Sequence, residues 1–135
     1  MKVKLFLQAI TLFAVIFLIG CSKDEDKTPS NGTIDVAVGT YKGTIDIIGG
    51  TKKFDEILVV SKLSATRIRV KVQNSSLNLA DRDIDVMNNS NISIQALATE
   101  PQGLFIYTLQ NKSLNFLSKQ TAEGQLQYSF EGVKQ

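Results

Sequence analysis

The chain has 135 residues, and its 15 basic and 13 acidic side chains exclude the strongly basic surface of a nucleic-acid-binding protein. It has no histidine and one cysteine, which excludes the usual zinc sites, a disulfide bond within the chain and the commonest catalytic bases and nucleophiles. We therefore expect no enzymatic activity, no cofactor, no resident metal ion and no nucleic-acid partner.

Residues 1–20 have the composition of a secretion signal. Lys2 and Lys4 give a positive start, and apolar residues dominate the stretch that follows them. A segment this short that ends in small residues is typical of a signal peptide rather than of a membrane-spanning helix.

The end of this segment has a more specific motif. Leu18, Ile19, Gly20 and Cys21 match the lipobox of bacterial lipoproteins, in which the thiol is acylated and the peptide is cut before the cysteine. Acylation would also remove a lone reactive thiol from an exported protein. We predict that Cys21 is the lipid-modified N-terminus and that several acyl chains hold the protein on a membrane.

Residues 21–33 are charged and poor in apolar side chains, so we predict a flexible, lipid-anchored acidic tether. Lys23, Asp24, Glu25 and Asp26 also resemble the surface-export signal that Bacteroidota-type bacteria place behind the lipidated cysteine. Two interpretations stay open, a sorting signal and a solvated linker. The expected location is the outer membrane, at the cell surface or facing the periplasm.

Residues 34–135 are expected to form one all-β domain. Apolar and polar residues alternate in most segments, which is typical of strands with one buried face. Turn residues separate the segments, giving about eight antiparallel strands in a sandwich or a barrel. The alternating segments are residues 41–47, 67–72, 83–86, 91–95, 113–116 and 125–131.

Two further strands do not alternate cleanly. Residues 54–60 and 104–107 place apolar side chains on both faces. Either these strands are covered on both sides, or one face is an exposed apolar patch.

The first and last strands resemble those of a known family. Gly39, Tyr41 and Gly43 form a Gly-x-Tyr-x-Gly motif shortly after the lipobox and tether, and the strand from Tyr128 to Lys134 ends in an aromatic residue and a glycine. These features resemble the small calycin-like (lipocalin-like) β-barrel lipoproteins of Bacteroidota. The resemblance implies a small up-and-down barrel of about eight strands, whose last strand pairs with its first and leaves no free edge.

The interior of such a barrel is just wide enough for its own side chains or for one small ligand. Residues on the apolar sides of their strands should converge there and would face any ligand; they are Tyr41, Ile45, Val70, Ile94, Phe116 and Tyr128. Seven aromatic residues could fill the space completely, namely Tyr41, Phe54, Phe105, Tyr107, Phe116, Tyr128 and Phe130.

Charged side chains form two rows on neighbouring strands. The basic row is Arg67, Arg69 and Lys71, and the acidic row is Asp81, Asp83 and Asp85. The basic row would suit an anionic ligand and the acidic row a weak surface calcium site, but both also fit solvated strand faces that pair with each other.

These observations favour an outer-membrane lipoprotein that acts as a non-enzymatic binding or accessory module. One alternative is a protein-interaction or hydrolase-inhibitor lipoprotein. Another is a carrier of one small apolar ligand. The expected partners are the membrane, through the lipid anchor, and a protein or small molecule that the sequence does not identify.

Overall fold

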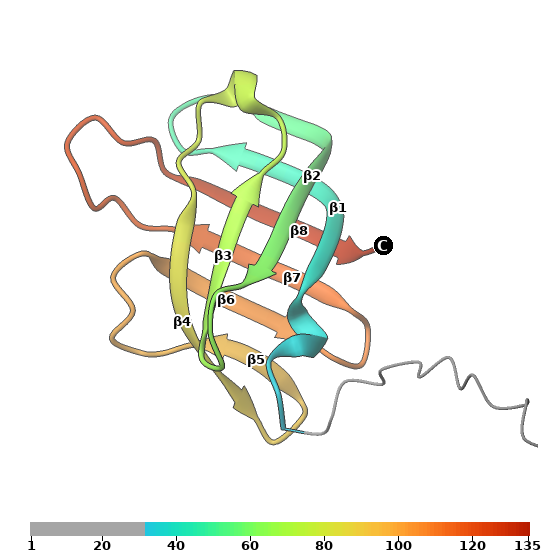
Figure 1. Cartoon of the computed structure of the whole chain (residues 1–135). Helices are drawn as coiled ribbons and strands as arrows, with labels where there is room; N and C mark the ends of the chain where they lie inside the picture. The colour runs from blue at the N-terminus through green and yellow to red at the C-terminus, as the bar shows by residue number, and fades with distance from the viewer. Residues whose placement is uncertain (1–31) are drawn as a thin grey trace, which may run out of the picture.

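A computed structural model describes residues 32–135, which form a closed antiparallel barrel of eight strands (Figure 1). This confirms the predicted all-β class and excludes the sandwich. The strands are β1 (Gly39–Ile47), β2 (Lys52–Lys62), β3 (Arg67–Val72), β4 (Arg82–Asn89), β5 (Ser93–Ala96), β6 (Gly103–Thr108), β7 (Ser113–Ser118) and β8 (Tyr128–Lys134). Two short 3-10 helices accompany them, η2 (Asp35–Ala37) and η3 (Ser75–Leu77).

The predictions for the N-terminal segment lie outside the described residues. They concern the lipobox residues Leu18, Ile19 and Gly20, the lipidation site Cys21, and the sorting cluster Lys23, Asp24, Glu25 and Asp26.

Each strand pairs with the strand that follows it in the chain, and β8 closes the circle by pairing with β1. At this seam Gly43 of β1 lies opposite Gly132 of β8. Gly43 belongs to the Gly-x-Tyr-x-Gly motif and Gly132 is the glycine of the last strand, so the two motifs meet where the barrel closes. Their lack of side chains permits a very close approach of the two backbones.

The up-and-down topology gives the barrel two different ends (Figure 1). The helix end carries η2 and the turns at residues 63–66, 90–92 and 109–112. The loop end is formed by the connections at residues 48–51, 73–81, 97–102 and 119–127, two of which are the longest in the barrel. Gly32 lies at the helix end, where its backbone N–H donates to Oδ1 of Asn91 at 2.8 Å.

The helix end is closed by side chains from three directions. The Tyr41 hydroxyl donates to the carbonyl oxygen of Ala37 in η2 at 2.6 Å. The ring of Tyr41 meets that of Tyr107 edge-on, with centroids 5.8 Å apart, and so joins β1 to β6 across the interior. Lys134 Nζ donates to the carbonyl oxygen of Val36 at 2.9 Å and lies over the Tyr107 ring.

Inward-facing side chains form one continuous hydrophobic cluster through the barrel. The residues predicted to converge in the interior are at most 2% exposed; they are Tyr41, Ile45, Val70, Ile94, Phe116 and Tyr128. Phe105, Tyr107 and Phe130 are buried with them. Aromatic and branched aliphatic side chains therefore occupy the interior from both ends.

Phe54 was expected among the interior aromatic residues, and this expectation is wrong. Its side chain is 69% exposed. Gly43 pairs with Glu56 and Ile45 pairs with Lys53, so β2 has an extra residue at this point, and Asp55 has a positive φ of 58°. Such a bulge interrupts the inward–outward alternation, and Phe54 therefore lies outside.

Two other apolar residues were wrongly expected to lie on inward strand faces. Ile92 belongs to the turn between β4 and β5, after Ser90 and Asn91 with their positive φ angles, and its side chain is exposed. Leu126 lies in the loop before β8 and is exposed too. In both cases an apolar residue continues the alternation past the end of the strand.

Candidate functional site

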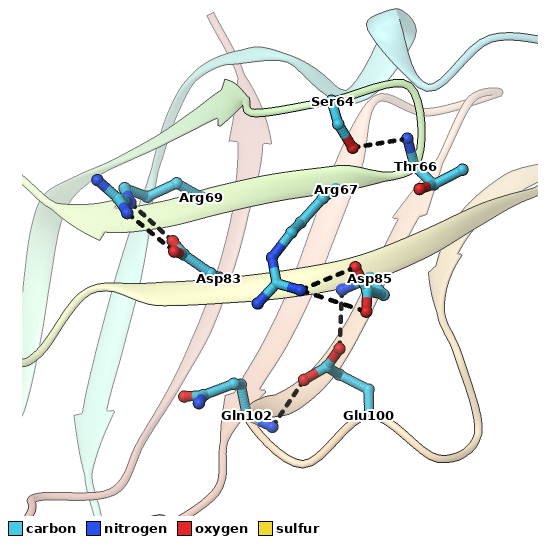
Figure 2. A network of polar contacts seen from close by, with 8 residues as sticks. All are labelled: Ser64, Thr66, Arg67, Arg69, Asp83, Asp85, Glu100 and Gln102. Carbon is cyan, nitrogen blue, oxygen red and sulfur yellow. Dashed lines mark hydrogen bonds and ion pairs between the residues drawn. The ribbon is translucent and has the colours of Figure 1, made fainter.

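The predicted charged rows lie opposite each other on the outer face of β3 and β4 (Figure 2). Arg69 binds Asp83 through two contacts, Nε to Oδ1 at 2.7 Å and Nη2 to Oδ2 at 2.8 Å. Arg67 Nη1 contacts both carboxylate oxygens of Asp85 at 3.3 and 3.4 Å. The hydrogen bond from Arg69 holds the pKa of Asp83 below its usual value.

This pairing changes the interpretation of both rows. The carboxylates of Asp83 and Asp85 are engaged by arginines, and Asp81 precedes β4 instead of lying within it. Within residues 32–135 no group of three carboxylate, cysteine or histidine side chains could hold a metal ion. The two rows together form an ion-pair ladder, which consists of the partly exposed cross-strand pairs Arg69–Asp83 and Arg67–Asp85.

Glu100 accepts backbone hydrogen bonds at the point where β5 ends (Figure 2). Its carboxylate is buried and accepts the backbone N–H of Asp85 at 2.8 Å through Oε2 and that of Gln102 at 2.9 Å through Oε1. Because β5 stops at Ala96, the Asp85 N–H has no strand beside it to bond. The Glu100 side chain takes the place of that strand, and its backbone oxygen accepts Lys119 Nζ at 2.9 Å.

Arg82 is the most unusual residue of the loop end. It opens β4, shares the inward face with Ile84 and Val86, and is 1% exposed. Its Nη2 donates to the carbonyl oxygen of Leu126 at 3.5 Å, and its Nε has no hydrogen-bond partner among the described residues. Burial lowers the pKa of Arg82 below its usual value.

Tyr128 lies beside this guanidinium on the inner face at the start of β8. Its ring packs edge-on against Phe116, with centroids 5.6 Å apart, and its backbone N–H donates to Oγ of Ser118 at 2.9 Å. Its buried hydroxyl has no hydrogen-bond partner in the described part of the chain. Burial raises the pKa of Tyr128, and the charge of Arg82 opposes this shift.

The loop at residues 119–127 precedes Tyr128 and contacts Arg82 through the carbonyl oxygen of Leu126. It is fixed at both ends, because Lys119 N donates to Gln102 O and Ile48 N donates to Gln127 O, each at 2.9 Å. Ile48, Leu97 and Leu126 give the loop end an exposed apolar rim. The arrangement therefore places one buried cation and two hydrogen-bond donors without a partner among the described residues at an end of the barrel whose exposed side chains include apolar ones.

A second feature lies on the outer wall of β6, β7 and β8. Leu104 and Ile106 point outward and are 48% and 44% exposed, and Leu104 pairs with exposed Leu117. Together with Asn115 and Glu131 they line a shallow groove of about 240 Å³. For residues 104–107 the structure thus supports the exposed apolar patch, one of the two alternatives from the sequence.

The site at the loop end was missed in the sequence for different reasons. Arg82 stands two residues before Ile84, so the parity of β4 places it inward, but the prediction from the sequence considered only the acidic residues on either side of it. Glu100 carries no periodic signal, since it stands in a turn next to Pro101. Its role depends on where β5 ends.

Comparison with known proteins found no matching family model, no matching curated protein and no matching solved structure. Among the described residues, no helix is long and apolar enough to span a membrane.

Proposed function

We propose that this chain is an outer-membrane lipoprotein, anchored through Cys21, whose barrel is a non-enzymatic binding module. The lipobox and the acidic tether support the anchor. The place of Gly32 supports an orientation, because the chain enters the barrel at the helix end. The loop end then lies on the far side of the barrel from the tether and is free to meet a ligand.

The observation that carries the binding role is the buried guanidinium of Arg82. It lies buried at the loop end, in contact with the carbonyl oxygen of Leu126, with Nε unpaired by any residue from 32 to 135. A charge taken out of water is normally paired and hydrogen-bonded, and exceptions point to a function. The chemistry of the site suits recognition of an electron-rich group.

The anchor is tested by replacing Cys21 with Ser and supplying cells with radiolabelled fatty acid. We expect the variant to lose the label and to leave the membrane fraction, because the acylated sulfur is gone. Ser22→Ala is the matched control and should keep both. Unchanged label and fractionation in Cys21→Ser would contradict a lipoprotein.

The outer groove supports a second candidate, a protein-interaction or hydrolase-inhibitor lipoprotein. Exposed apolar side chains clustered in a groove are typical of protein contacts. The test is inhibition of a purified peptidoglycan hydrolase by the mature chain and by Leu104→Ser, with Met87→Ser, an exposed position outside the groove, as control. Inhibition weakened by Leu104→Ser alone would favour this candidate over ligand binding at the loop end.

A further inference from the structure

We propose that Arg82 and Tyr128 bind the carboxylate of a small organic acid at the loop end of the barrel. This inference rests on the proposed binding function and names the class of ligand. It starts from two buried polar groups for which residues 32–135 provide too few partners.

The charge of Arg82 is not neutralised from within the described chain. Its guanidinium donates one hydrogen bond within residues 32–135, to the neutral carbonyl oxygen of Leu126 at 3.5 Å, the long limit for such a contact. Of the neighbouring acids, Asp83 pairs with Arg69 on the outer face, and Asp81 is exposed before β4 begins; the charge of Asp81 acts on Tyr128, but Asp81 forms no ion pair with Arg82. A counter-ion is therefore what this site lacks.

The hydrogen-bonding pattern indicates the same kind of partner. The Nε of Arg82 can only donate, and the Tyr128 hydroxyl beside it has a proton to donate. The missing group must accept both. A carboxylate offers two acceptor oxygens, matches the planar fork of a guanidinium, and carries the single negative charge that one arginine neutralises. A water molecule would accept the hydrogen bonds but leave the charge unpaired.

The surroundings limit the rest of the ligand. The rim of Ile48, Leu97 and Leu126 is apolar, and the Phe116 ring packs against Tyr128 below. The acid must therefore be small and its organic part apolar. Access requires the loop at residues 119–127 to lift, and its contact with Arg82 is the long bond from Leu126.

The experiment follows the Nε–H resonance of Arg82 in the 15N-labelled mature chain, residues 21–135, in detergent. Benzoate and butyrate are the probes, and benzamide and butanol are their uncharged matches. We expect both acids to shift this resonance saturably and their neutral matches to leave it unchanged. Inorganic phosphate should compete poorly, because it has no apolar part to contact Ile48, Leu97 and Leu126.

Variants locate the site, and their benzoate binding is followed through the backbone N–H resonance of residue 128, which every variant retains. Tyr128→Phe removes one donor and should weaken benzoate binding several-fold, while Arg82→Met should weaken it by at least about tenfold. Arg69→Met, which removes an arginine from the outer face of the neighbouring strand, should bind like the unmodified chain. If Arg82→Met does not fold, the Tyr128→Phe variant and the neutral probes still decide.

No saturable shift of the Arg82 resonance with either acid would overturn the proposal, and so would equal shifts with acids and neutral matches. Binding that survives in Tyr128→Phe and Arg82→Met would overturn it too. These failures leave the anchor untouched, since Cys21→Ser reports on it separately. Conversely, loss of the anchor proposal does not affect the spectrum of Arg82.

Discussion

Gly43 and Gly132 face each other across the seam of the barrel, so closely that neither could carry a side chain. A Cβ on Gly132 would lie 2.5 Å from the carbonyl oxygen of Lys42, and one on Gly43 would overlap the carbonyl oxygen of Glu131. Backbone atoms cannot move aside as a flexible side chain can. The glycines are therefore a condition of closure at this point.

Replacing Gly43 with Ala should lower the free energy of unfolding by about 1–3 kcal/mol or more, because β8 must shift to admit the methyl group. Chemical denaturation of the mature chain measures this. The control is Gly124→Ala in an exposed loop, where φ is +76° but no atom lies within 4 Å. It should cost only about 1–2 kcal/mol of backbone strain. A smaller loss in Gly43→Ala than in the control would contradict the account of the seam.

Phe116→Ala tests whether the interior is filled. The side chain is 2% exposed and contacts Tyr128, so its truncation should leave a cavity and cost about 3–5 kcal/mol. Domains of this size have only about 5–15 kcal/mol in total, so the denaturation midpoint should fall sharply. Leu117→Ala, the exposed neighbour, should have a small effect. A loss below about 1 kcal/mol, with an apolar molecule co-purifying, would instead indicate a hollow carrier barrel.

Glu100→Ala should destabilise the junction between β4 and the loop that follows β5. It leaves the partly buried Asp85 and Gln102 N–H groups without their acceptors, at a cost of up to about 1 kcal/mol for each hydrogen bond. Hydrogen exchange at the Asp85 amide should accelerate more than at amides of β7 and β8. Glu123→Ala, in an exposed loop, is the control. Unchanged protection of Asp85 would rule out the bridging role.

Asp83→Asn tests the ion-pair ladder through its pH dependence. Since Arg69 holds the pKa of Asp83 below that of the unfolded chain, the contribution is fully present above the unfolded pKa. It is lost as the pH falls through the lower folded value. At neutral pH the variant should be less stable by at most about 1 kcal/mol, because the pair is partly exposed. Melting curves of the two proteins should converge in strong acid, and an undiminished difference there would exclude this electrostatic origin.

The acidic cluster after the anchor is tested with intact cells. If Asp24, Glu25 and Asp26 direct export to the surface, their replacement with Ala should protect the protein from added protease. The control replaces Thr28 and Ser30 with Ala, which leaves the charges in place. Equal cleavage of all three forms would make the cluster a plain linker.

The alternation of residues such as Ile68, Val70 and Val72 was sufficient to predict strands and their buried faces. In a strand, the face on which a side chain lies depends only on its position relative to its neighbours in sequence. The choice between a sandwich and a barrel was not available from this signal. It depends on the pairing of β1 with β8, which the residue pattern alone does not encode.

The candidate site was harder to predict for the same reason. Phe54 follows the apolar pattern, yet a bulge that begins at the next residue turns it outward. Arg82 looks like one of several surface charges, yet its side chain faces inward from β4 and contacts Leu126, in a loop 44 residues further along the chain. Both outcomes depend on contacts between segments, and the sequence shows only the segments.

The circular order of the strands also constrains how the molecule is made. Every other pairing joins neighbours in the chain, while β1 must wait for β8, the last of the eight barrel strands in chain order. Until then β1 has an unpaired edge, which is the kind of edge on which strands of different molecules join. The folding chain therefore depends on the pairing of β8 with β1, and a chain that lacked β8 would keep an open sheet with unpaired edges in place of a barrel.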